Sequence, residues 1–183
     1  MKAAFFVLGV EVEKRPRGLV DIMDERQGHV VGNHSYDHIG SPGTTTKLLA
    51  TKEGKARVLW QYEKTHDIVS KYRQMQHWRA PRLEGIQSTW ELIRNSPKLK
   101  SYLSHCDSHA DSGDSLGAKT AETMLNNLLS SKENFGLFQP RWKNRGNLRL
   151  LFHVKDSTAS ALPKVLEGLQ RAGQRIVDFS QES

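Results

Sequence analysis

Short apolar runs alternate along this chain with longer stretches in which apolar residues recur at helical spacing. The runs predict buried strands, and the periodic stretches predict amphipathic helices. The predicted strands are residues 3–10, 29–33, 77–81, 148–154 and 175–179. The predicted helices are residues 17–26, 55–74, 87–95, 118–130 and 160–172. Strands that alternate with helices in this way predict an α/β architecture with a parallel sheet.

Polar stretches separate several of these elements. Residues 39–54 are rich in Gly, Thr, Ser and Pro and predict a loop, and residues 132–147 predict a basic, aromatic loop. Residues 99–115 are polar and show little periodicity. Because no Gly-Ser linker divides the chain and its length suits one core, residues 1–183 are expected to form a single domain.

Polar side chains that can carry chemistry stand at the ends of three predicted strands. His34 and His38 follow the second strand, Arg79 ends the third, and His153 lies near the end of the fourth. The carboxyl ends of parallel strands meet at one edge of a sheet, which is where sites collect in such folds. Two neutral imidazoles four residues apart can bind one divalent metal ion, so this edge is a candidate metal site.

Charge and composition narrow the class of protein. The net charge of +7 and the pI near 9.6 favour polyanionic partners such as nucleic acid or cell-wall polymer. The basic residues are scattered, however, which is typical of a solvated surface, so no specific nucleic-acid partner is predicted. The single Cys106 excludes an internal disulfide framework.

The sequence predicts no membrane span, because no run approaches the roughly 18 apolar residues that a span needs. Lys2 and residues 3–10 imitate a weak signal peptide. Charged residues follow at once without a small-residue cleavage site, so this run is interpreted as a strand and no cellular address is predicted.

Several motifs together resemble the polysaccharide deacetylases of carbohydrate esterase family four, also called the NodB homology domain. Residues 5–9 (FFVLG) and 28–38 (GHVVGNHSYDH) resemble its histidine motif with the leading strand. Residues 79–82 (RAPR) resemble its arginine–proline motif, and residues 150–153 (LLFH) with the later segment 175–179 resemble its last motif and closing strand. The similarity covers nearly the whole chain.

The resemblance implies a distorted (β/α) barrel and a metal-dependent hydrolase that removes N-acetyl groups from amino-sugar polysaccharides or oligosaccharides, such as chitin or peptidoglycan. His34 and His38 would be ligands of a divalent metal, zinc above all. His153 would be the general acid that protonates the leaving amine. Arg79 would hold a carboxylate by a forked contact, and Trp142 would stack on a sugar ring. Arg79 as a structural ion-pair partner and His153 as a core histidine are the competing interpretations.

The chain departs from the family pattern at its start. Family members carry an Asp-Asp motif before the strand that corresponds to residues 3–10, with one aspartate as third metal ligand and the other as base. The barrel is therefore expected to lack its first strand, and its exposed edge would offer a surface for self-association. The aspartate that supports His153 stays open among Asp107, Asp111 and Asp114. Activity of this chain is accordingly uncertain, and the alternative is a catalytically inactive, glycan-binding descendant.

Overall fold

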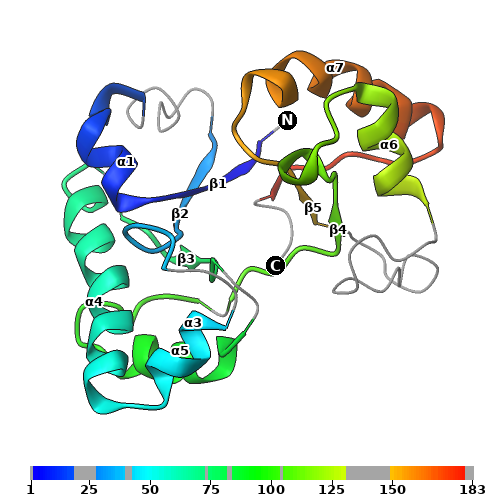
Figure 1. Ribbon diagram of the computed structural model, residues 1–183. Helices are drawn as coiled ribbons and strands as arrows, with labels where there is room; N and C mark the ends of the chain where they lie inside the picture. Colours follow the sequence, from blue (N-terminus) through cyan, green and yellow to red (C-terminus); the bar gives the residue numbers. More distant parts are fainter. Residues whose placement is uncertain are drawn as a thin grey trace. The chain divides into compact units, whose positions relative to one another are not determined.

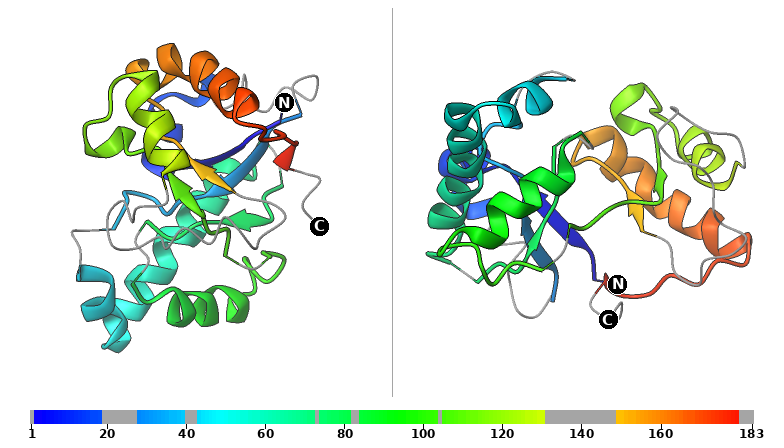
Figure 2. Two further views of the ribbon diagram at one scale, coloured as in Figure 1. Left: turned by 90° about the vertical axis from the view of Figure 1, so that its right-hand side faces the viewer. Right: turned by 90° about the horizontal axis from the view of Figure 1, so that it is seen from below.

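The computed structural model describes most of the chain. The described residues are 2–18, 28–39, 43–72, 74–81, 84–103, 105–130 and 149–179. Contacts within the chain define two compact units, Lys2–Cys106 and Asp107–Ser183, and Figures 1 and 2 show the elements of each. The expectation of a single domain stays a prediction.

The unit Lys2–Cys106 is built on a parallel sheet of β1 (Ala4–Val7), β2 (Val30–Asn33) and β3 (His77–Trp78), in that order. Phe5 lies opposite Val31 in the first pair of strands, and Gly32 lies opposite His77 in the second. The parallel pairing places the carboxyl ends of all three strands at one edge, as the sequence predicts. The residues that follow β2 and β3 are therefore neighbours.

Four helices are described around this sheet: α1 (Gly9–Lys14), α3 (Thr44–Leu49), α4 (Lys52–Val69) and α5 (Ile86–Asn95). The long helix α4 contacts α1, α3, α5 and β2, and Figure 1 shows it running beside the sheet. It begins where the Thr51 hydroxyl accepts a hydrogen bond from the Gly54 N–H at 3.0 Å. Its apolar face buries Val58 and Tyr62, and the Tyr62 ring meets Trp78 edge-on at 5.6 Å. This packing makes α4 the rigid support of the unit.

The unit Asp107–Ser183 contains a second, shorter parallel pair of strands, β4 (Ala110–Asp111) and β5 (Leu150–Leu151). The 3-10 turn η1 (Asp114–Leu116) follows β4. The helices α6 (Ala121–Leu129) and α7 (Asp156–Arg171) pack against each other. Their contact forms a separate apolar core, which includes Met124, Leu128, Val165 and Leu169.

Several local predictions differ from the structure. The predicted strands 77–81 and 148–154 are reduced to β3 and β5, and the polar stretch 99–115 contains β4. Residues 9–10 begin α1 instead of ending a strand, and the predicted loop 39–54 contains α3. The predicted strand 175–179 is not formed, because a strand requires a hydrogen-bonded neighbour and none is paired with these residues in the described part of the chain. The predicted helix 17–26 lies largely, and the loop 132–147 entirely, outside the described residues.

The junction of α3 and α4 should tolerate no side chain at Gly54. A Cβ there would lie 2.0 Å from the carbonyl oxygen of Leu48, which is backbone and cannot rotate away. We expect Gly54→Ala to lower the free energy of unfolding by about 2 kcal/mol in urea titration, although alanine is the better helix former. Gly18→Ala is the matched control, since open space surrounds that Cβ. Equal stability of the two variants would contradict the close approach.

Candidate metal and acid–base site

The two predicted metal ligands lie next to each other at the carboxyl end of β2. The imidazole rings of His34 and His38 are 5.1 Å apart between centroids and inclined by 73°, and both are half-buried. Residues 34–38 form no helix. Instead the backbone turns through two left-handed residues, Ser35 at φ 69° and His38 at φ 68°. The proximity that the sequence predicts for two histidines four residues apart therefore comes from a sharp loop and not from a helix.

The structure fixes the tautomer of His34. Its Nδ1 lies 2.9 Å from the carbonyl oxygen of Arg79, at the end of β3. A carbonyl can only accept, so Nδ1 carries the proton and Nε2 keeps its lone pair. A ring nitrogen with a lone pair, opposite a backbone carbonyl that orients the ring, is what a metal-ligating histidine requires.

Buried amide oxygens bind the backbone between the two histidines. The Asn33 side-chain oxygen accepts from the Ser35 N–H at 2.9 Å. The side-chain oxygen of Gln61, on α4, accepts from the N–H groups of Tyr36 at 2.9 Å and Asp37 at 3.0 Å. Three successive N–H groups of the loop are thus satisfied by side chains. Sequence reasoning missed Gln61, although a glutamine on the core-facing side of a predicted amphipathic helix is a recognisable sign of a buried polar contact.

A hydrogen-bonded chain leads from this loop to a histidine on α4. The Asn33 side-chain NH₂ donates to the Tyr102 hydroxyl at 3.0 Å. That hydroxyl lies 3.1 Å from Nδ1 of His66. Because a hydroxyl oxygen can accept a second hydrogen bond, either partner can be the donor. Burial lowers the pKa of the His66 imidazole.

Arg79 is buried beneath the histidine loop, with 8% of its surface exposed. Its N–H donates to the Asn33 carbonyl at 2.9 Å, and its Nη1 donates to the Cys106 carbonyl at 3.0 Å. Its own carbonyl orients His34. Arg79 thus joins the ends of β2 and β3, while the forked contact with a carboxylate stays a prediction.

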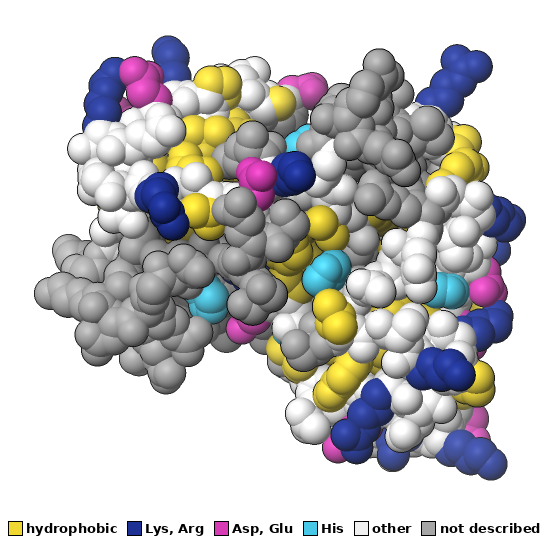
Figure 3. Space-filling view, turned by 180° about the vertical axis from the view of Figure 1, so that it is seen from behind, with side chains coloured by type: hydrophobic (Ala, Val, Ile, Leu, Met, Phe, Trp, Pro, Cys, Tyr) yellow, Lys and Arg dark blue, Asp and Glu magenta, His cyan; other side chains and the backbone are white. Residues whose placement is uncertain are grey.

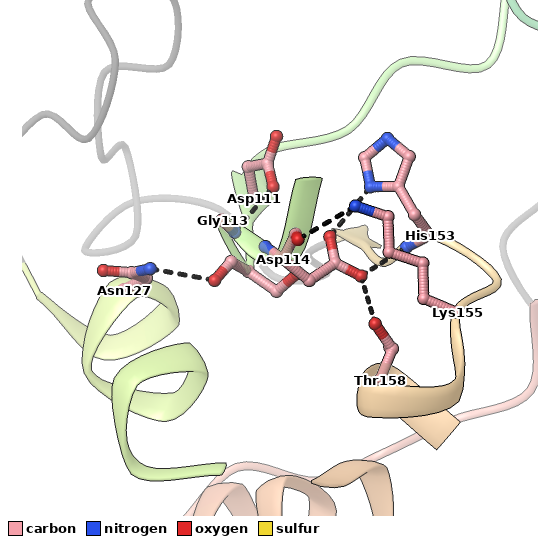
Figure 4. Close-up of polar contacts among 8 residues, drawn as sticks. Asp111, Gly113, Asp114, Asn127, His153, Lys155 and Thr158 are labelled. Carbon is pink, nitrogen blue, oxygen red and sulfur yellow. Dashed lines mark hydrogen bonds and ion pairs between the residues drawn. The ribbon is translucent and has the colours of Figure 1, made fainter. Parts of the chain in front are cut away.

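In the unit Asp107–Ser183, Asp114 binds His153 (Figure 4). Its Oδ1 lies 2.8 Å from Nδ1 of His153, and its Oδ2 accepts from the His153 N–H at 2.7 Å. Oδ2 also accepts from the Thr158 hydroxyl at 2.7 Å. The Asp114 side chain is fully buried, whereas 41% of the His153 side chain is exposed. A partly exposed imidazole is therefore hydrogen-bonded to a buried carboxylate.

Of the three candidate aspartates, Asp114 is the described partner of His153. Asp111 accepts the Gly113 N–H at 2.8 Å within its own turn, and Asp107 accepts the Ser108 N–H at 2.8 Å. The proposed sugar-stacking Trp142 lies outside the described residues.

Asp114 is held as an anion by its donors. Burial alone would raise the pKa of this carboxyl, but the hydrogen bonds from Thr158 and from the backbone and ring of His153 outweigh burial, so the pKa lies below its ordinary value. An ionised carboxylate only accepts, so Nδ1 of His153 donates to it. Nε2 is then the nitrogen of His153 that can take up or release a proton.

The structure brings His34, His38 and Arg79 together in one unit, and Asp114 and His153 in the other. The described residues contain no group of three or more His, Cys, Asp or Glu side chains arranged to hold a metal ion. The two histidines would thus supply part of a coordination shell.

On the face drawn in Figure 3, Lys and Arg side chains are interspersed with neutral ones. Within the described residues no helix is long and apolar enough to span a membrane.

The sequence profile of the family described as polysaccharide deacetylase matches residues 1–97, which is more than half of the 183 residues. The chain therefore belongs to the polysaccharide deacetylase family. No curated protein matches it.

Solved structures of family 4 carbohydrate esterases (CE4) share the fold. A mutant of a CE4 pseudoenzyme with restored enzymatic activity aligns with a TM-score of 0.69 and 16% identity, over 99% of this chain and 57% of that one. The enzyme from Streptomyces lividans, in complex with acetate, aligns with a TM-score of 0.65 and 20% identity, over 94% and 76%. A CE4 esterase from Streptococcus mutans aligns with a TM-score of 0.65 and 18% identity, over 94% of this chain and 71% of that one. The predicted fold, a distorted barrel of the polysaccharide deacetylase type, is confirmed, and this chain spans little more than half of the pseudoenzyme.

The hydrogen bonds that connect His66 to Asn33 through Tyr102 predict that the stability of the protein depends on pH. Because the folded state lowers the pKa of His66, the unfolded state binds the proton more readily. The contribution of His66 is therefore complete above its ordinary pKa of 6.5 and is lost as the pH falls below it. Between pH 7.5 and 5.5 we expect the unfolding free energy, measured by urea titration, to fall more in the wild type than in His66→Asn, which keeps an acceptor that does not titrate. Parallel pH profiles would contradict this coupling.

Proposed function

We propose that the chain is a metal-dependent hydrolase that removes N-acetyl groups from an amino-sugar polysaccharide of the chitin or peptidoglycan kind, or a truncated form of such an enzyme. The observation that carries this proposal is the pair of adjacent imidazoles at the end of β2, with His34 held in the tautomer that a metal ligand needs. Membership of the polysaccharide deacetylase family supports the substrate class.

His34 and His38 fit a divalent metal, for which we propose zinc. Neutral imidazole nitrogen is a preferred ligand of zinc, and because Nδ1 of His34 faces the Arg79 carbonyl, Nε2 is the nitrogen that would bind it. A bound metal would polarise the acyl carbonyl and lower the pKa of water. The family resemblance places a third ligand, an aspartate, ahead of the strand that corresponds to β1.

His153 is the proposed general acid. When the amide C–N bond of the substrate breaks, the departing sugar amine needs a proton, and Nε2 of His153 would supply it. Asp114 would position the ring and stabilise its protonated form, since the buried carboxylate faces Nδ1. Arg79 would act indirectly, by orienting His34 through its carbonyl.

A second candidate function is glycan binding without catalysis. It is favoured by the lack of any third acidic, cysteine or histidine side chain beside the imidazole pair among the described residues. One structural neighbour is itself described as a CE4 family pseudoenzyme, which has this fold at 16% identity.

Zinc binding tests the metal site. We expect isothermal titration calorimetry to detect one zinc ion per chain, bound at least about tenfold more weakly by His34→Ala, because loss of a ligand should cost no less than loss of the group that orients one. His66→Ala is the control, since His66 lies in the same unit but outside the pair. Equal zinc affinity of wild type and His34→Ala would reject the assignment.

Acetate release from chitooligosaccharide separates the two functions. With zinc present we expect the wild type to release acetate, and His153→Ala to do so about 100-fold more slowly because the leaving amine loses its acid. Val154→Ala is the matched control, a neighbour that is 89% exposed. A wild type that binds the oligosaccharide but releases no acetate would replace the hydrolase with the glycan-binding alternative.

A further inference from the structure

We propose that Gln61 is the positioning residue that keeps the rings of His34 and His38 facing each other. The inference concerns the loop itself, and it rests on the proposed function only where metal binding is used to measure it. Gln61 lies on α4 and is 2% exposed. It touches neither imidazole in the contacts described and acts through the backbone between them.

The contact is unambiguous in its chemistry. The N–H groups of Tyr36 and Asp37 both point at one atom of the Gln61 side chain, at 2.9 Å and 3.0 Å. Two donors can share only an acceptor, so that atom is the amide oxygen and not the NH₂ group. One buried oxygen thus fixes two consecutive peptide units inside the histidine pair.

The loop needs such a support because its backbone is strained. Ser35 and His38 are left-handed without being glycine, and each such residue costs about 1 kcal/mol or more. If the N–H groups of Tyr36 and Asp37 lost their acceptor, extended conformations of the loop would regain that energy. His38 would then turn its ring away from His34.

Other contacts hold the loop on both sides: Ile39, which follows His38, is buried in the core, and the Tyr36 ring meets Trp60 of α4 at 5.4 Å. The N–H groups of Gly9 and Val10 donate to the carbonyls of Ser35 and Tyr36, and Asn33 binds Ser35 from only two residues away. Gln61 reaches Asp37 across 24 residues of sequence, from a helix whose neighbouring side chains are packed in the core. It therefore fixes the two peptide units before His38 to a helix packed in the core, whereas His34 has its own bond to Arg79.

The test uses the full chain with three variants. Gln61→Met keeps the size of the side chain but removes the amide acceptor, and Gln61→Glu keeps an acceptor oxygen. Thr65→Val is the matched control: this fully buried residue lies one turn along α4, and its hydroxyl donates to the main-chain carbonyl of Gln61 at 3.1 Å, so the variant alters the surroundings of Gln61 but keeps its amide oxygen. In the metal-free protein we expect a nuclear Overhauser effect between ring protons of His34 and His38 in the wild type, Gln61→Glu and Thr65→Val. We expect it to vanish in Gln61→Met.

Zinc titration gives the second readout. Zinc affinity should fall about tenfold or more in Gln61→Met, as for groups that orient metal ligands, and stay near the wild-type value in Gln61→Glu and Thr65→Val. If Gln61→Met does not fold, Gln61→Asn withdraws the oxygen by one methylene and should show the same losses. Retention of the ring–ring signal and of affinity in the acceptor-deficient variant would overturn the inference, as would equal losses in Thr65→Val. A wild type that shows the ring–ring signal but binds no zinc would refute the proposed metal site alone.

Discussion

The five residues after β2 impose the constraint on which the unit Lys2–Cys106 depends. Their backbone turns through two left-handed residues that are not glycine, and this turn is what places one imidazole beside the other. Such a turn persists only where its surroundings fix it. Buried side-chain oxygens on Asn33 and Gln61 do this, and both depend on the packing of α4 against the sheet. The conformation of the polar loop therefore depends on the packing of the apolar core.

In the unit Asp107–Ser183 the feature that its surroundings must stabilise is a buried charge, where in the other unit it is a strained turn. A fully buried carboxylate is costly unless donors surround it. Asp114 meets this condition through the Thr158 hydroxyl and through the backbone and ring of His153. Thr158 lies in the first turn of α7, whose packing on α6 fixes it. In both units a packed helix carries the polar group that positions a histidine.

The sequence allowed the strands β1, β2, β3 and β5 and the helices α4 to α7 to be predicted, because their apolar patterns are those of buried elements, but it did not predict β4 in the polar stretch 99–115. It did not allow α3 to be predicted, because residues 44–49 begin with three threonines, which favour helix weakly, whereas in the structure α3 packs closely on α4 at Gly54. Strand ends marked the four site residues, His34, His38, Arg79 and His153. Chain position could not select Asp114 from its neighbours, since the choice depends on which carboxylate the turn η1 buries.

The left-handed histidine loop and the Asp114–His153 pair bear on the choice between a hydrolase and an inactive descendant. A protein that only binds glycans needs neither a left-handed His38 nor an ionised carboxylate under His153. The left-handed residues cost folding free energy that a relaxed loop would regain, and the ionised Asp114 depends on donors from Thr158 and His153 that glycan binding alone does not require. A hydrolase needs both, because its metal requires converging lone pairs and its leaving group requires an imidazole of fixed tautomer. The presence of both features in this chain supports the proposed hydrolase over glycan binding alone.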